Sequence, residues 1–291
     1  MRDSRVEQEY PDVGWASLVW RRFRKHRLAL LGGTVIVLLY LTAIFAPLVA
    51  PYSPFDLNPA RRLEAPSVAH PMGLDEVGRD VLSRVIFGTR ISLTIGFVAA
   101  GISLVVGVCL GALAGYIGGL VDGIIMRVVD VLMAIPTFLL IIAIVAAVGP
   151  NMLNVMMVIG LTYWSSYARI TRGAVLSLRA QEFVEAARAI GGNNAQIIVR
   201  HILPNCLAPV MVLATLNVAG AILIETTLSF LGFGVQPPTP SWGAILTTGR
   251  VYMRRAPHIA LFPGLAITIT VLAFNLLGDG LRDALDPKLK V

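Results

Sequence analysis

Charge is scarce in this sequence. Asp, Glu, Lys and Arg make up 14% of its 291 residues, against about 25% in a typical soluble domain, and hydrophobic residues make up 56%. So few charged side chains cannot give a fold of this size the surface of a soluble protein. The composition therefore excludes an ordinary soluble domain and predicts an integral membrane protein.

Lysine, cysteine and histidine are also rare. None of the three lysines follows a glycine, so the Gly-Lys-Ser/Thr ending of a phosphate-binding loop is absent and ATP hydrolysis by that route is excluded. Cys109 and Cys206 have no cysteine or histidine at ligand spacing and are predicted to be small buried side chains. The four histidines are dispersed, without a Ser-His-Asp or His-Glu-x-x-His pattern. We expect no catalytic residue, no metal site and no cofactor bound by this chain.

Arginine supplies 21 of the 24 basic residues, and these cluster at the ends of apolar runs. A nucleic-acid-binding protein needs a continuous basic face, which separate clusters do not provide. Arginines that flank hydrophobic segments instead indicate membrane topology. We expect membrane lipid, and no nucleic acid, among the partners of this chain.

Five uncharged or nearly uncharged runs are long enough to cross a membrane, which takes about 20 residues. The first, 28–50, exceeds the about 7–15 residues of a signal-peptide core and is predicted to be a retained span. The others are 91–121, 131–168, 206–233 and 256–278. The run 131–168 is too long for one crossing, and Gly149-Pro150-Asn151 near its middle predicts a turn that makes it a helical hairpin.

The distribution of basic residues decides between five and six spans. Six spans, with the hairpin, place 16 Lys and Arg residues inside and 8 outside, whereas five spans place 11 inside and 13 outside. Basic residues are enriched on the cytoplasmic side of membrane proteins. We therefore predict an all-α polytopic membrane protein with six transmembrane helices and both termini in the cytoplasm.

The most polar segment between the runs, residues 182–205, then lies in the cytoplasm. Helical spacing predicts a first short helix with an apolar stripe of Phe183, Ala187 and Ile190. Such a stripe either docks into a groove of another protein or packs on its own bundle, and the pattern leaves both open.

Local signals define the ends of this helix and of a second one. Glu185 and Arg188 are spaced for an ion pair on one helix face. Gly191-Gly192 predicts a left-handed C-cap. Asn194 is expected to cap a second helix that ends before Pro204, where the chain is redirected.

Glu185-Ala186-Ala187, Gly191 and Leu203-Pro204 together resemble the EAA signature of ABC importer permeases. The general signature has an apolar residue in place of His201, but His-Ile-Leu-Pro-Asn is the usual wording in the peptide-importing subgroup. Further segments resemble that subgroup, so the resemblance runs from about Trp15 to the C-terminus; they are 73–84, 229–234, 235–243 and 274–283. The chain is similar to the C-type permease subunit of dipeptide, oligopeptide and nickel importers.

The resemblance implies a type I importer permease fold in the bacterial inner membrane. It implies a homologous second permease subunit, two ATP-binding subunits that carry ATP and Mg²⁺, and an extracytoplasmic substrate-binding protein. The substrate would be a di- or oligopeptide, with nickel or another small solute as the alternative. The segments would be a cytoplasmic segment 1–27, the first span 28–50, an extracytoplasmic loop 51–90, and a core permease domain 91–291 with a coupling loop at 171–205.

In that family the coupling loop docks into the ATP-binding subunit. Alanine would allow close approach, glycine a tight exit from the helix, and glutamate a polar anchor. The docking set implied here is Phe183, Glu185, Ala186, Ala187 and Gly191.

Charges in or near the spans are the remaining candidates. Glu225, in the outer part of the fifth span, either lines a substrate path or makes a structural hydrogen bond. Asp122, Arg127 and Asp130 are placed in a short cytoplasmic loop, with a local pair between Arg127 and Asp130. On the outside, residues 80–90 are predicted to form an interfacial amphipathic helix or, alternatively, a platform for a binding protein. Residues 236–240 are predicted to form a stiff extended loop.

Two rival functions come from other classes. A secondary transporter working alone is expected to show an internal repeat and ionisable groups near the membrane midplane, and the sequence has no such repeat and few such groups. A membrane scaffold would account for the spans and the docking helix, but not for the wide resemblance.

Overall fold

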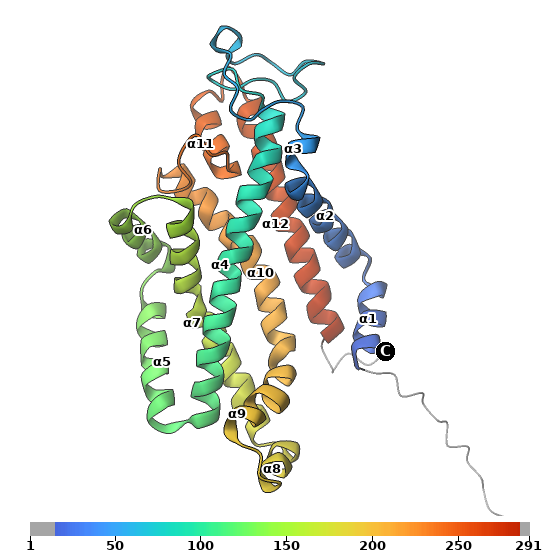
Figure 1. Ribbon diagram of the computed structural model, residues 1–291, viewed down its shortest axis with the longest axis vertical. Coiled ribbons are helices and arrows are strands. Elements are labelled where there is room, and N and C mark those ends of the chain that lie inside the picture. The colour runs from blue at the N-terminus through green and yellow to red at the C-terminus, as the bar shows by residue number, and fades with distance from the viewer. Residues whose placement is uncertain (1–14, 286–291) are drawn as a thin grey trace, which may run out of the picture.

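The computed structural model describes residues 15–285, and they form a long bundle of helices (Figure 1). By length and composition, four helices could each cross a membrane: α2 (Arg27–Ile44), α4 (Val81–Ile117), the part Ala208–Phe230 of α10 (Leu203–Phe230), and α12 (His258–Leu285). A fifth crossing is possible if α5 (Gly119–Ala134) and α6 (Thr137–Val148), which are bent by 91° to each other, count as one broken span. No strand occurs among the described residues.

Helices α4 and α7 (Met152–Arg179) pack closely along their length because α4 presents glycines to α7. A Cβ added at Gly107 would lie 2.4 Å from the Cβ of Tyr167, and one at Gly111 would lie 2.5 Å from the carbonyl oxygen of Ala168. Gly115 continues the series against Val175. Small residues at every fourth position let two helix backbones approach, as in membrane helix pairs. This pair is the axis of the bundle.

The predicted turn near the middle of the long run 131–168 is present. Helix α6 ends at Gly149, whose φ is +93°, and Asn151 caps α7 by accepting a 2.8 Å hydrogen bond from the backbone of Asn154. A second break at Ile135-Pro136 separates α5 from α6.

The region expected to be a short loop around Asp122 and Asp130 is instead helix α5. The predicted pair of Arg127 with Asp130 is wrong, because Asp130 pairs with Arg169 of α7. Asp122 likewise receives two hydrogen bonds of 2.5 and 2.6 Å from Arg172. Two arginines of α7 thus form ion pairs with two carboxylates of α5.

One end of the bundle, the upper end in Figure 1, carries the loop that follows α2 and the short helices α3 (Ala46–Val49), η1 (Pro59–Arg61) and α11 (Trp242–Val251). Asp80 caps α4: its Oδ2 accepts 2.8 Å bonds from the backbone and hydroxyl of Ser83, and its Oδ1 lies 2.9 Å from Nδ1 of His70. The predicted helix at 80–90 is present as the first turns of α4, but its interfacial position is wrong, since Val81, Arg84 and Val85 are buried.

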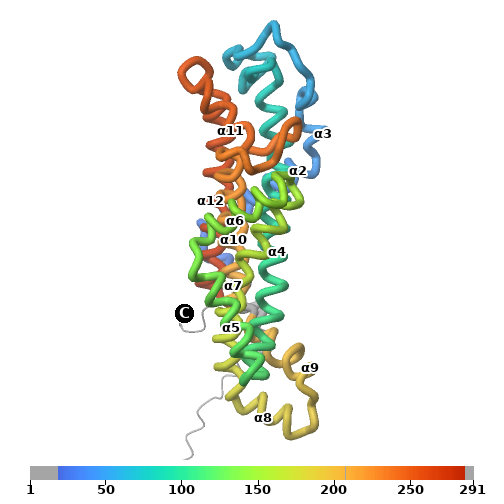
Figure 2. The backbone as a smooth tube through the Cα atoms, turned by 90° about the vertical axis from the view of Figure 1, so that its left-hand side faces the viewer, coloured from blue at the N-terminus to red at the C-terminus, as the bar shows by residue number. Residues whose placement is uncertain are grey.

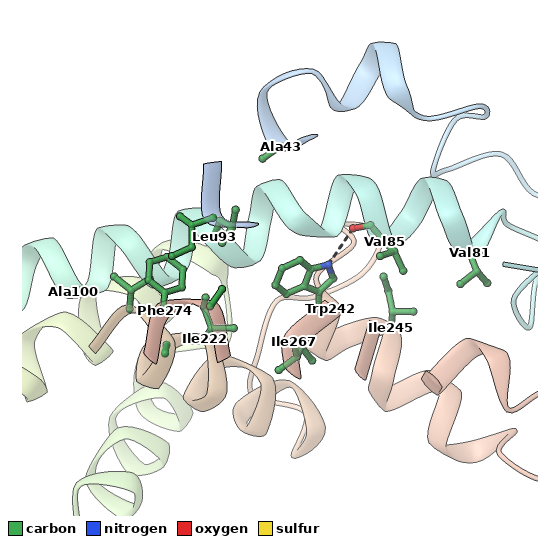
Figure 3. Close-up of a cluster of buried hydrophobic side chains, with 14 of the residues drawn as sticks. Ala43, Val81, Val85, Leu93, Ala100, Ile222, Trp242, Ile245, Ile267 and Phe274 are labelled. Atoms are coloured by element: carbon green, nitrogen blue, oxygen red, sulfur yellow. Dashed lines mark hydrogen bonds between the residues drawn. The ribbon is translucent and has the colours of Figure 1, made fainter. Parts of the chain in front are cut away.

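Helix α11 explains that burial, because Trp242 at its start is fully buried against α4 (Figure 3). The indole Nε1 donates a 3.1 Å hydrogen bond to the carbonyl of Val85, and the backbone N–H of Trp242 donates a 3.2 Å bond to the hydroxyl of Ser92. Gly88 leaves room for the indole ring. Residues 236–240, which lead into α11, form a loop as expected, but it turns at Pro237-Pro238 and is not extended.

The other end of the bundle collects α1 (Trp15–Lys25), the end of α12, α8 (Glu182–Ala189) and α9 (Asn194–Ile197) (Figures 1 and 2). His26, between α1 and α2, lies 3.4 Å from a carboxylate oxygen of Asp283 in α12. Of the two cysteines, Cys206 is buried as expected, whereas Cys109 is exposed on the outer face of α4.

Candidate functional site

The polar segment between α7 and α10 lies at the lower end of the bundle as two short helices, α8 and α9 (Figure 2). Four of the predicted docking residues are on the surface: Phe183 with 41% of its side chain exposed, Glu185, Ala186 and Gly191. Ala187 instead faces the bundle and is buried.

The apolar stripe predicted for α8 is therefore divided between two faces. Val184 and Ala187 form the inner face, while Phe183 and Ile190 point outward, and Ile190 is 88% exposed. The spacing of residues alone did not distinguish these faces, since all four lie on overlapping helical stripes. An outward pair of large apolar side chains is a feature of a protein-binding surface.

Glycine ends α8 as predicted. Gly191 has a φ of +86°, its N–H donates to the carbonyl of Arg188, and the N–H of Gly192 donates to the carbonyl of Ala187. These two bonds are those of a Schellman motif, in which a left-handed residue satisfies the last carbonyls of a helix. The motif turns the chain sharply and leaves Gly191 at the surface with open space around it.

The second helix begins one residue earlier than predicted. Asn193, rather than Asn194, is the N-cap, and it forms a capping box with Gln196. After α9 the chain passes through a single π-helical segment, η2 (Ile198–Ile202), straight into α10. Pro204 sits in the first turn of α10, where a missing N–H is tolerated. The segment is thus joined to α10 without a loop.

Tyr116, in the last turn of α4, connects the segment to the bundle. Its hydroxyl donates a 3.1 Å hydrogen bond to Oδ1 of Asn194, and the guanidinium of Arg188 lies 5.9 Å from the centre of its ring. Its backbone carbonyl accepts a 2.9 Å bond from Arg179 of α7. Arg188 therefore contacts Tyr116, and no ion pair with Glu185 is formed in the described chain.

An apolar core lies beneath α8 and α9 and fixes their position. It is drawn from α4, α7, α8, α9, η2 and α10, and its buried members are Ala112, Tyr116, Val175, Val184, Ala187, Ile197, Ile202 and Cys206. A groove of about 250 Å³ opens on the outer side between α8 and η2, bordered by Ile190, Gly191, Arg200 and His201. Because six elements share this core, a displacement of α8 is opposed by its contacts with α4, α7 and α10.

Glu225 of α10 lies at the opposite end of the molecule and is fully buried. Its Oε1 accepts hydrogen bonds of 2.8 Å from Ser229 and 2.9 Å from Ser241, which precedes α11. This geometry favours the structural interpretation of Glu225 over a place in an open path.

An all-helical bundle whose long helices are apolar enough to cross a membrane is the architecture of an integral membrane protein. Two known protein families match this chain. The family described as "binding-protein-dependent transport system inner membrane component" matches residues 107–291, and the "N-terminal TM domain of oligopeptide transport permease C" matches residues 15–66. The chain belongs to the binding-protein-dependent inner-membrane transport permeases.

Curated relatives match over almost the full chain. The dipeptide transport system permease protein DppC of Alkalihalophilus pseudofirmus is 44% identical over 98% of this chain and 93% of its own length. The glutathione transport system permease protein GsiD of Escherichia coli O157:H7 is 47% identical over 93% of this chain and 90% of its own. The di/tripeptide permease DppC of Pseudomonas aeruginosa is 45% identical over 93% and 91%.

The fold has counterparts among solved structures. A chain of the MetNI methionine ABC transporter, in an inward-facing conformation, superposes with a TM-score of 0.58 and 19% identity, covering 70% of this chain and 96% of that one. A second crystal form of MetNI gives a TM-score of 0.55. The described bundle therefore has the type I ABC permease fold.

Proposed function

We propose that this chain is the permease subunit of an ATP-driven importer of di- or oligopeptides. The single observation that carries the proposal is the α8–α9 pair. Its outer face is exposed, and its inner face packs on the long helices α4, α7 and α10. The names of the curated relatives support the peptide substrate. Glutathione, itself a tripeptide, is the second candidate, because a glutathione permease is 47% identical.

Six spans and cytoplasmic termini form part of the proposal. The crossings would be α2, α4, the bent pair α5–α6, α7, α10 and α12. Support comes from α7, which packs along α4 and carries no charge from Met152 to Ala168. Support also comes from α1 and the end of α12, which lie at the same end as α8 (Figure 1).

In this proposal the chain forms half of a translocation pathway with a homologous permease. Two ATP-binding subunits, which bind ATP and Mg²⁺, hold the α8 surfaces through Phe183, Glu185, Ala186, Ile190 and Gly191. Closing of these subunits pulls the α8 segments together, and α4, α7 and α10 move with them through the shared core. Rocking of packed helices exposes the path alternately to each side. An extracytoplasmic binding protein delivers the substrate at the α11 end.

Reconstitution tests the proposal directly. The complete complex in vesicles is expected to take up labelled dipeptide only with both ATP and the binding protein. The variant Ile190→Asp should abolish coupled uptake, because it places a charge in the docking surface, while the bundle still folds. Val68→Asp is the matched control, since Val68 is fully exposed at the far end. Uptake driven by an ion gradient through this chain alone would overturn the proposal. Competition between labelled dipeptide and glutathione for uptake decides between the two substrates.

A further inference from the structure

A small crevice with three polar side chains in its lining lies between α4, α7 and α10, away from both ends of the bundle. Ser103 of α4, Tyr163 of α7 and Asn217 of α10 border it, and its other walls are small or aliphatic residues of the same helices. Asn217 stands midway along α10, roughly 21 Å from Leu203 at 1.5 Å per residue. In a hydrocarbon layer about 30 Å thick, this position is deep in the membrane.

Asn217 is not fully used by the fold. Its Nδ2 and the hydroxyl of Tyr167, one turn along α7 from Tyr163, are both buried; they interact with each other, and neither has another hydrogen-bond partner. Ser103, by contrast, is satisfied by bonds to the carbonyls of Gly160 (2.8 Å) and Ala99 (3.1 Å). Polar side chains are costly inside a membrane and mark substrate routes. An amide carries two N–H donors and a carbonyl, so the contact with Tyr167 leaves Asn217 with capacity for a ligand or a water.

The crevice is narrow in this conformation. Its volume is about 10 Å³, close to the about 10–15 Å³ that a cavity needs in order to hold one water molecule, so a larger ligand would enter only when the helices separate. Gly220, one turn from Asn217, borders it, and a Cβ added there would meet nothing within 4 Å.

We propose that Asn217, together with Tyr163, forms a peptide-bond recognition site in the translocation path. This inference rests on the proposed function. A side-chain amide carries one carbonyl acceptor and two N–H donors, so it can pair with the C=O and N–H of a peptide bond in the substrate. No charged residue borders the crevice among the described residues. The site therefore recognises the backbone shared by all peptides and does not select by the charge of their termini.

The test uses the complete complex in vesicles with saturating, substrate-loaded binding protein. Asn217→Leu removes the amide at similar volume, and uptake of a dipeptide should fall about tenfold, equivalent to about 1.4 kcal/mol or one hydrogen bond. Uptake of the same dipeptide methylated at its peptide nitrogen should fall less than about twofold, because that ligand lacks the N–H. Thr227→Val on the same helix is the control, since Thr227 is exposed and bonded to its own helix.

A second variant keeps the test decisive if Asn217→Leu does not assemble. Gly220→Leu fills the open space with a side chain and should block uptake, whereas Gly101→Leu, at a glycine of α4 that is equally open but outward-facing, should not. Three outcomes would overturn the inference. Asn217→Leu could take up the dipeptide as the wild type does, its uptake of both ligands could fall equally, or Gly220→Leu could keep wild-type uptake. Failure of the wild-type complex to take up any peptide would instead overturn the proposed function.

Discussion

The hydroxyl of Tyr116 donates a 3.1 Å hydrogen bond to Oδ1 of Asn194, joining the last turn of α4 to the first residue of α9. The two residues are 78 positions apart in the chain. Through this bond and the buried core beneath it, the exposed helix pair is fixed to the longest helix of the bundle.

Tyr116→Phe removes that bond and keeps the ring that Arg188 overlies. A hydrogen bond of this kind contributes about 0.5–1.5 kcal/mol, so the complex should still assemble. We expect more ATP hydrolysed per peptide transported, because α8 would be held less firmly to α4 when it follows the ATP-binding subunit. The measurement is the ratio of uptake to hydrolysis in vesicles, and an unchanged ratio would show that this bond does not carry the coupling.

Gly191 should tolerate asparagine better than valine. Its φ of +86° lies in the left-handed region, where a β-branched residue costs about 1–2 kcal/mol or more and asparagine costs less. Gly191→Val should therefore lower substrate-stimulated ATP hydrolysis several-fold, and Gly191→Asn should retain most of it. Because open space surrounds Gly191, equal loss in both variants would point to a docking contact and not to backbone conformation.

The pair of Asp122 with Arg172 can be tested by exchange. Arg172→Asp places two carboxylates side by side and should lower the melting temperature of the detergent-solubilised protein by a few degrees, equivalent to about 1 kcal/mol. The double variant Asp122→Arg with Arg172→Asp should regain most of the loss. If it does not, α5 is positioned by packing and not by the ion pair.

Glu225 should tolerate glutamine but not leucine. Glutamine keeps a carbonyl oxygen that can accept from Ser229 and Ser241, so uptake should remain within about twofold of the wild type. Glu225→Leu leaves the O–H donors of two buried serines without their acceptor, at a cost of about 1–3 kcal/mol each, and should reduce the amount of folded protein. Normal folding with lost uptake in the glutamine variant would favour a role in the substrate path.

Local features of the fold could be predicted from the sequence. The turn at Gly149-Pro150-Asn151 and the C-cap at Gly191 were correct, because turn and cap chemistry is set by a few adjacent residues. The same local signals placed the N-cap of α9 only one residue away, at Asn194 in place of Asn193.

Features that depend on distant partners could not be predicted in this way. Asp130 pairs with an arginine 39 residues further on, and Trp242 bonds to Val85 across 157 residues, so neither partner was visible in a local pattern. The helix α5 and the burial of residues 81–90 follow from these contacts. For the same reason the sequence does not show that Ile190 faces outward and Ala187 inward, because these directions depend on how α8 packs against α4 and α7.

Helix α4 has 37 residues, roughly 55 Å at 1.5 Å per residue, which is well beyond the about 30 Å of a hydrocarbon layer. Its first turn is capped inside the upper loops by Asp80, and its last turn holds α9 through Tyr116. If the proposed partners bind at its two ends and favour different tilts of α4, their binding is coupled. By reciprocity, the factor by which the proposed binding protein changes the affinity for an ATP-binding subunit then equals the factor in the reverse direction, and measuring either one gives both.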